Sequence, residues 1–331
     1  MSLLKPSHPF SKSQGLLFLL IIAMVGPIFL NDYLIHVLIM ILLYAYLGQC
    51  WNIVCGYTGQ FSLGHAAFFG IGGYLSTYCF VKMNLSPWIG LFFVGAVVAT
   101  LLGLFMGYLC FRYRLKGFFF ALVTLSFSEI LRILAQNFME GKAAGILIPF
   151  RGSDPLVFQF EKKLSYYYIA LALVIFISLI VRKIENSSWG DKFKAIREDE
   201  DAAESIGINT MKYKLISIGL SAYLTALGGT FYSQYLLFVD PNIAFGATVG
   251  IEMMLRPILG GLGTVFGPLI GSAILTPIAE IPKYFLPSVR GIELVVYGVI
   301  IIITVLSMPN GILGLVGQRK RKTSVIQKEA S

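Results

Sequence analysis

The chain alternates between long apolar stretches and short polar segments. Eight stretches of 18 or more residues contain no Asp, Glu, Lys or Arg: 13–31, 33–54, 60–81, 88–111, 164–181, 215–239, 257–279 and 294–317. A helix of about 20 apolar residues crosses the hydrocarbon core of a bilayer. Each stretch therefore predicts a membrane-spanning helix, and residues 117–138, interrupted by Glu129 and Arg132, predict a ninth.

The basic C-terminal tail, residues 318–331, decides between nine and ten spans. Nine would leave this tail outside the cell, whereas a further span at about 243–262 returns it to the cytoplasm, where basic residues of membrane proteins collect. We therefore predict an all-α polytopic transmembrane helical bundle of about ten spans, one of which can be re-entrant. It forms one domain over residues 1–331, with the N- and C-termini cytoplasmic.

The positions of the basic residues support this orientation. With the N-terminus inside, 17 of the 26 Lys and Arg residues fall in the expected cytoplasmic segments 1–12, 112–116, 182–214 and 318–331, and seven fall in external segments. Lys5 and Lys12 precede the first apolar stretch without a convincing cleavage site after it, which favours an uncleaved first helix.

Composition restricts the class of protein. The chain is 56% hydrophobic and 13% charged, about half the charged share of soluble domains, which excludes soluble enzymes, nucleic-acid-binding proteins and disordered chains. The net charge of +9 is accounted for by the cytoplasmic loops and indicates no nucleic-acid partner. The four cysteines match no zinc or haem spacing, so no metal site is predicted.

Two pairs of opposite charges interrupt the apolar stretches. Glu129 and Arg132 are three residues apart, and Glu252 and Arg256 are four apart, so each pair shares one face of a helix. A lone charge at the bilayer centre costs about 2.5–3.5 kcal/mol, and pairing lowers this cost. Each pair is either a neutralised structural contact or part of a proton or substrate relay.

Small residues recur at every fourth position in two stretches. The first stripe is Gly95, Ala99, Gly103 and Gly107, and the second is Gly263, Gly267 and Gly271. Small residues at this spacing let helix backbones approach closely in lipid. Both stripes therefore predict tight helix packing.

The longest polar segment, residues 184–212, is predicted to lie in the cytoplasm. Together with its flanks, over residues 182–214, it has seven basic and seven acidic residues, so it is not a patch for anionic lipid. Its apolar residues fit one side of a short helix that Gly207 would end, and we expect that side to dock onto a protein. These residues are Ala195, Ile196, Ala202, Ala203 and Ile206.

Five blocks of this sequence resemble a known family. Asp201-Ala202-Ala203, followed by three residues and Gly207, is similar to the Glu-Ala-Ala-x-x-x-Gly loop of ABC-importer permeases, with Asp in place of Glu. Residues 59–68, 114–125, 260–268 and 309–311 are similar to further blocks of the branched-chain amino acid permeases of the LivM type. The resemblance covers about residues 33 to 315, although residues 141–146 and Arg256 depart from the expected pattern.

The resemblance implies a subunit of an ATP-driven importer in the bacterial inner membrane. It carries branched-chain amino acids by alternating access, and its partners are a LivH-type permease, two cytoplasmic ABC ATPases and an external substrate-binding protein. Contact with one ATPase would be made by Arg197, Glu198, Asp201, Ala202, Ala203 and Gly207. This chain has no phosphate-binding loop, so it binds no cofactor, and ATP and Mg²⁺ are used by the partner ATPases.

Gln60, Ser62 and His65 are polar residues at the start of an apolar stretch, and they are candidates to face the translocation pathway. The alternative for His65 is a hydrogen bond between helices. The family also leaves open a permease for urea or short amides.

Two other classes of function are less compatible with the residues. Three histidines, with no His-Glu-x-x-His or Gly-x-Ser-x-Gly motif, leave no basis for a catalytic site, so we expect no enzyme. A proton-coupled secondary transporter could use the two ion pairs, and it would stop when the proton gradient is dissipated.

Overall fold

The structure is a computed structural model that describes residues 23–138, 141–285, 295, 298–300, 302 and 311–314. Its long helices are α2 (Asp32–Asn52), α3 (His65–Met83), α5 (Ala96–Arg112), α6 (Gly117–Phe138), α7 (Lys163–Glu185), α10 (Thr210–Leu236), α12 (Ala247–Gly260) and α13 (Gly267–Phe285). The predicted spans at 13–31 and 294–317, and the tail from residue 318, lie wholly or largely outside the described residues.

Shorter elements join the long helices. These are η1 (Gly26–Phe29), η2 (Ile53–Tyr57), α4 (Pro87–Ile89), η3 (Gly90–Gly95), η4 (Lys142–Ala144), β1 (Ile146–Leu147), η5 (Pro155–Val157), α8 (Ser188–Glu198), α9 (Glu200–Ser205), β2 (Phe238–Val239) and α11 (Pro241–Ala244). The expectation of an all-helical fold thus holds for the described residues apart from the short strand pair β1–β2.

Within the described residues, six helical segments are long and apolar enough to cross a membrane. They are Asp32–Tyr57, Pro87–Arg112, Gly117–Phe138, Lys163–Glu185, Thr210–Leu236 and Pro241–Gly260. The chain is therefore a multi-pass helical membrane protein. The predicted spans at 117–138 and 243–262 coincide with α6 and with α11–α12.

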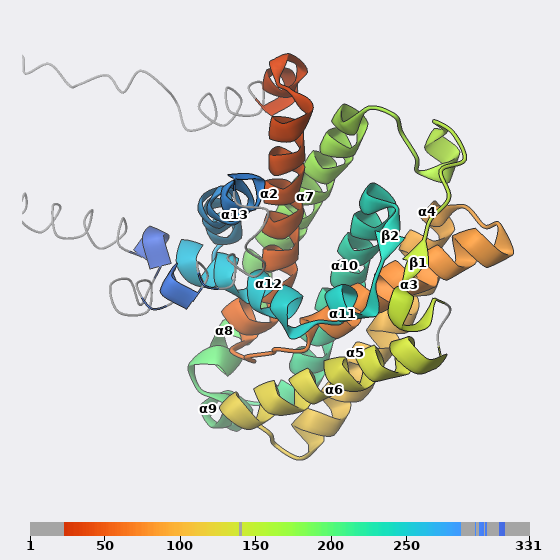
Figure 1. Cartoon of the computed structure of the whole chain (residues 1–331). Helices are drawn as coiled ribbons and strands as arrows, with labels where there is room; N and C mark the ends of the chain where they lie inside the picture. The colour runs from red at the N-terminus through yellow and green to blue at the C-terminus, as the bar shows by residue number, and fades with distance from the viewer. Residues whose placement is uncertain are drawn as a thin grey trace, which may run out of the picture.

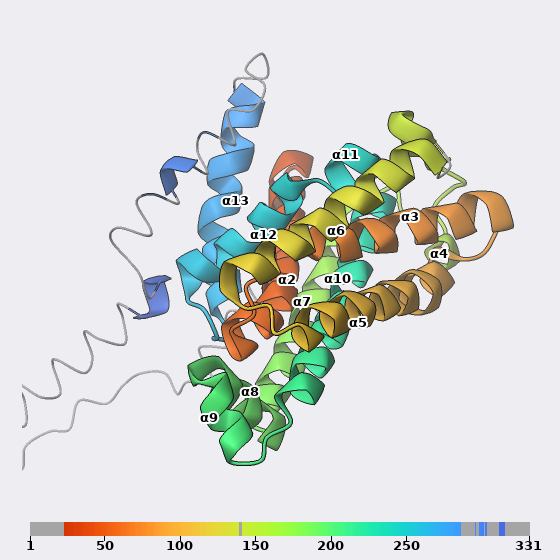
Figure 2. The same cartoon turned by 90° about the horizontal axis from the view of Figure 1, so that it is seen from below.

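Helix α10 packs between α3 and α5, while α2 packs against α7, α12 and α13 (Figures 1 and 2). The side chain of Tyr46 joins the two groups, because its hydroxyl donates to the carbonyl oxygen of Leu224 at 2.7 Å. Large aromatic side chains such as Trp51 and Phe231 fill the buried core.

The two predicted stripes of small residues lie at helix contacts. A Cβ added at Gly103 would lie 2.8 Å from the Cβ of Ala222, and one added at Gly107 would lie 2.9 Å from Ile218, so α5 fits closely against α10. A Cβ at Gly271 would collide with the carbonyl oxygen of Arg256, which places α13 directly on α12. Tight helix packing is confirmed for the first stripe and for Gly271, whereas Gly263 lies between α12 and α13 and not in a helix.

Helix α10 connects the two ends of the bundle. It begins beside α9, where the hydroxyl of Thr210 donates to Glu204 at 2.6 Å, and it is followed by β2. Strand β2 pairs antiparallel with β1, with Ile146 opposite Val239 and Leu147 opposite Phe238. The segment between α6 and α7 therefore lies at the end opposite α8 and α9 (Figure 1).

Candidate functional site

The polar segment between α7 and α10 forms two helices. Ser187 accepts a hydrogen bond from the backbone N–H of Trp189 and caps α8. Asp199 has an extended backbone (φ −157°, ψ 112°), and its carboxylate accepts from the N–H groups of Asp201 and Ala202 at 2.9 and 3.0 Å. The prediction of a single short helix is wrong, because Asp199 ends α8 and caps α9.

The break at Asp199 changes which side chains face the bundle. Phe193, Ile196 and Ala203 are buried, whereas Ala202 and Ile206 are exposed. The predicted residues therefore do not share one face: Ile196 and Ala203 pack within this chain, whereas Ala202 and Ile206 stay exposed. The reason is that a helical period counted through Asp199 does not continue into α9.

Gly207 ends α9 as predicted. Its φ is +86°, a conformation that favours glycine, and its N–H donates to the carbonyl of Glu204 at 2.9 Å. The next N–H, of Ile208, donates to the carbonyl of Ala203 at 3.0 Å. These bonds satisfy carbonyls that a helix end otherwise leaves open.

Two lysines from other elements hold α9 against the bundle. Lys214 Nζ lies 2.5 Å from Glu200 Oε1, and Lys116 Nζ lies 3.4 Å from Glu200 Oε2 and 3.5 Å from Asp201 Oδ1. The Lys214 side chain is only 3% exposed and that of Glu200 15% exposed. Lys214 Nζ also lies 4.6 Å from the ring centroid of Phe111, at the end of α5.

Two members of this ion cluster, Glu200 and Lys116, have shifted pKa values. Burial raises the pKa of Glu200, but the hydrogen bond and charge of Lys214 and the charge of Lys116 outweigh burial and hold the pKa below its ordinary value. Burial lowers the pKa of Lys116, but Glu200 and Asp201 outweigh it and raise the pKa above its ordinary value. Both groups are therefore charged at neutral pH.

The predicted contact residues divide between the bundle and the surface. Arg197 Nη1 donates to the carbonyl oxygen of Gly56 at 2.6 Å, which ties α8 to η2. Ala203 faces inward, while Glu198, Asp201 and Ala202 face outward. Lys116 and Lys214 were not predicted to contribute to this site. A lysine within the first turns of an otherwise apolar helix was the available signal for Lys214.

Cavities flank this cluster on two sides. One of about 740 Å³ is lined by residues that include Arg112, Arg114 and Lys214. Another of about 480 Å³ is lined by residues that include Gln60 and Arg197. Lys116 and Glu200 line both cavities, so their ion pair separates them.

The candidate pathway residues Ser62 and His65 lie close together in the interior. His65 is buried, and its two ring nitrogens lie 3.0 Å from Ser62 Oγ and 2.9 Å from Ser221 Oγ. Ser221 in turn donates to the carbonyl of Cys50 at 2.7 Å, so this network joins α2, α3 and α10. Gln60 is also buried and donates to the carbonyl of Thr58 at 3.1 Å. The geometry of His65 matches the alternative of a hydrogen bond between helices, and a pathway role for the three residues stays a prediction.

The pair on α12 lies in the interior. Arg256 Nη2 is 3.7 Å from Glu252 Oε2, and the two side chains are 0% and 7% exposed. The guanidinium carbon of Arg256 lies 3.8 Å from the ring centroid of Tyr44 on α2. Pairing within one helix is confirmed, and the position between α12 and α2 favours a structural contact.

The pair on α6 lies on the surface of the chain. Arg132 Nε donates to Glu129 Oε2 at 2.9 Å, and a second bond joins Nη2 to Oε1. Arg132 Nη1 and Gln136 Nε2 both donate to Asn242 Oδ1 on α11, at 2.9 and 2.7 Å. The side chains of Glu129 and Arg132 are 49% and 26% exposed. The same sequence pattern thus gives one buried and one exposed ion pair.

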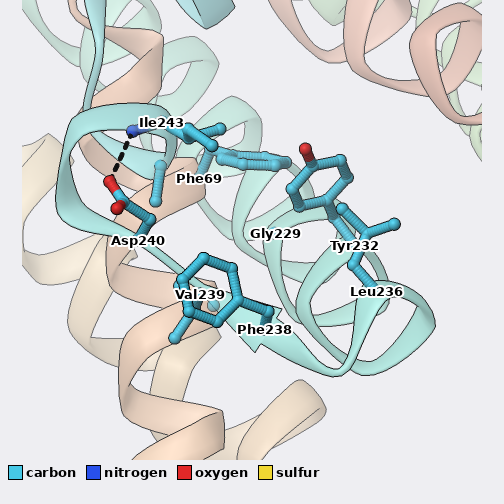
Figure 3. Close-up of a pocket in the computed structure, with 10 residues that line it drawn as sticks. Phe69, Gly229, Tyr232, Leu236, Phe238, Val239, Asp240 and Ile243 are labelled. Atoms are coloured by element: carbon cyan, nitrogen blue, oxygen red, sulfur yellow. Dashed lines mark hydrogen bonds between the residues drawn. The ribbon is translucent and has the colours of Figure 1, made fainter. Parts of the chain in front are cut away.

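A small pocket lies between α3, α10, β2 and α11, at the end of the bundle opposite α8 and α9 (Figure 3). Its volume is about 300 Å³, and its lining is mostly apolar, with Phe69, Tyr232 and Phe238 among the side chains. Asp240 is the charged residue of this lining, but its carboxylate accepts from the N–H groups of Asn242 and Ile243 and caps α11. The pocket therefore offers no charged group that is not already used within the fold.

Comparison with known proteins gives consistent matches. A family model described as the permease component of branched-chain amino acid transport systems matches residues 33–305. The chain is 27% identical over 326 residues to the high-affinity branched-chain amino acid transport system permease protein LivM of Salmonella typhimurium, covering 90% of this chain and 74% of that protein. It is 26% identical over 287 residues to the corresponding LivH protein of Escherichia coli K12, covering 82% of this chain and 91% of that protein. No solved structure matches the chain.

Proposed function

Since this chain belongs to the family of permease components of branched-chain amino acid transport systems, we propose that it is a permease subunit of an ATP-driven importer that carries leucine, isoleucine and valine into the cell. The observation that carries this proposal is the α8–α9 segment, a polar pair of helices held at one end of a membrane-spanning bundle by buried charges. It is a transport subunit, and ATP is hydrolysed by partner chains.

The orientation that we propose places α8 and α9 in the cytoplasm. The segments at that end carry Arg112, Arg114 and Lys116 together with the basic residues around α8, as expected for cytoplasmic loops. The strand pair β1–β2 then faces outward, toward an external substrate-binding protein. If α3, α13 and the predicted first and last spans also cross the membrane, the six segments become ten spans in the bacterial inner membrane with both termini inside.

In the proposed mechanism, an ABC ATPase binds the outward side of α8–α9, where Glu198, Asp201 and Ala202 are exposed. Movement of the ATPase on binding ATP displaces this segment as a rigid body. The ion cluster of Lys116, Glu200 and Lys214 passes the displacement to α6 and α10. A LivH-type permease and a second ATPase complete the complex.

The test is ATP-dependent uptake of labelled leucine and of labelled urea by the reconstituted complex of this chain with a LivH-type permease, the two ATPases and the binding protein. We expect leucine uptake that needs ATP and persists after the proton gradient is dissipated. Uptake of urea in its place would move the chain to the short-amide branch of the family. Rapid flux through this chain alone, without partners or ATP, would refute the proposal.

A further inference from the structure

Three helices, α5, α6 and α7, expose many apolar side chains at the surface of the chain. The charged residues of α5 and α7 lie only at their ends, such as Arg112 and Arg182, whereas α6 exposes charged and amide groups along its length. Neither residues 96–111 of α5 nor residues 164–181 of α7 include a charged or amide residue. Helix α6 carries four on or near its exposed face: Glu129, Arg132, Gln136 and Asn137. The faces of α5 and α7 therefore suit lipid, whereas that of α6 does not.

The polar groups of α6 lie deep in the membrane-spanning segment. At 1.5 Å per residue, Glu129 is about 18 Å along the axis from Gly117, near the middle of a hydrocarbon core about 30 Å thick. A long basic side chain can reach toward the membrane surface, but Arg132 is held by Glu129 and Asn242. A charge in lipid at this depth costs about 2.5–3.5 kcal/mol, so this face meets water or protein.

The geometry leaves hydrogen-bonding capacity unused. Arg132 has five N–H donors, of which its bonds to Glu129 and Asn242 use three. The two carboxylate oxygens of Glu129 have about four lone-pair positions, and Arg132 occupies two. An exposed carboxylate and guanidinium side by side complement a ligand with an ammonium and a carboxylate on one carbon. One helical turn after Glu129, Ile133 is exposed and offers contact to an apolar side chain.

Resting on the proposed function, we propose that Glu129, Arg132, Gln136 and Asn242, here called the α6 patch, form a transient site for the zwitterionic group of the transported amino acid. The patch lies on the wall of the aqueous route that this chain forms with its companion permease. Glu129 receives the ammonium group, Arg132 receives the carboxylate, and the exposed Ile133 contacts the branched side chain. The buried pair on α12 has no such access, since Arg256 is fully buried.

Cysteine accessibility tests the position of the patch. In a chain whose four native cysteines are replaced by serine or alanine, one cysteine is introduced as Ile133→Cys on α6, Leu101→Cys on α5 or Leu179→Cys on α7. All three native side chains are exposed in this chain. The assembled transporter is treated with a charged thiosulfonate reagent, with and without a non-hydrolysable ATP analogue. In one of these two states the reagent should modify the α6 cysteine at least tenfold faster than the cysteines on α5 and α7. Leucine with the binding protein should slow the reaction of the α6 cysteine.

Equal rates at the three positions, or an α6 cysteine that the reagent reaches in neither state, would overturn the proposal. The first result places the face in lipid and the second in a dry contact with the companion permease. Leucine uptake by the unsubstituted complex is measured in parallel. If that uptake is normal, only the patch fails, whereas its absence refutes the proposed function itself.

Transport kinetics test the role of the charges. Glu129→Gln and Arg132→Gln should each lower the maximal rate of leucine uptake at least tenfold, while the leucine concentration for half-maximal uptake stays the same, because the external binding protein sets it. Glu129→Asp should restore part of the rate. The proposal is refuted if both charge-removing variants assemble normally and transport at the original rate.

Discussion

Removing the buried amine of Lys214 tests how α9 is held. In Lys214→Met, Glu200 loses a hydrogen-bonded cation at 2.5 Å and keeps Lys116 at 3.4 Å. Removing one member of a buried ion pair costs about 3–5 kcal/mol, and a single hydrogen bond to a charged group contributes about 1.5–3 kcal/mol. Since Glu200 is partly exposed and retains Lys116, we expect a loss of about 2 kcal/mol in the docking of α9.

This loss has two measurable consequences. A change of about 2 kcal/mol corresponds to about a 30-fold change in the equilibrium between docked and undocked α9. Hydrogen exchange of the backbone amides in residues 200–207 should rise by that factor in the purified complex. Fewer leucine molecules should enter per ATP hydrolysed, while the ATPases continue to work, because the segment they move is no longer fixed to α10.

The matched control is Lys212→Met. Lys212 lies two residues away on the same helix but is exposed, so its removal should leave both measurements unchanged. Equal hydrogen exchange in the two variants would refute the reasoning. The double variant Glu200→Gln with Lys214→Met should lose less docking free energy than the two single changes together, because no charge is then left without its partner.

Four further predictions concern single groups. Gly207→Ala forces a side chain into a left-handed backbone with open space around it, so strain of about 1 kcal/mol should raise hydrogen exchange across α9 about fivefold, and an unchanged rate would contradict the backbone argument. Glu252→Gln leaves the charge of Arg256 buried beside a neutral group, so the purified complex should lose about 3 kcal/mol of stability, measured by denaturant unfolding; a normal midpoint would contradict a structural pair. His65→Ala should reduce the amount of assembled complex and the uptake together if the imidazole joins helices, whereas reduced uptake at normal assembly would place it in the pathway. Because the pKa of folded Glu200 lies below its ordinary value near 4.5, its contribution to docking is present above that pH and is lost as the pH falls through the lower folded value; hydrogen exchange of α9 that already rises between pH 7 and 6 would contradict this sign.

Much of the fold follows from patterns that depend on a few neighbouring residues. The apolar windows at 33–54, 88–111 and 117–138 became α2, α5 and α6, because a bilayer requires long apolar helices whatever their packing. The stripe containing Gly103 and Gly107 predicted a close helix contact for the same local reason. The stripe did not predict that the partner helix is α10, because every apolar helix in the chain is a possible neighbour.

The candidate site was less predictable because it depends on long-range contacts. The spacings in Glu129–Arg132 and Glu252–Arg256 predict pairing equally well, but only packing decides that the second pair is buried against Tyr44. The break at Asp199 separates Ile206 from Ile196, with which it was predicted to share a face, since a capping carboxylate competes with helix continuation. The ion pair of Lys214 could not be predicted from local spacing, because its partner Glu200 is 14 residues earlier and on a separate helix.

The continuity of α10 has a consequence for regulation. Its 27 residues, about 40 Å of helix, start beside the ion cluster and end at the strand pair on the far side of the membrane. Because a continuous helix of this length is stiff, a displacement of one end of α10 also moves the other end. In the proposed importer, binding of the substrate-loaded binding protein at the external end should therefore change the nucleotide affinity of the ATPases. Nucleotide binding should change the affinity for the binding protein by the same coupling free energy.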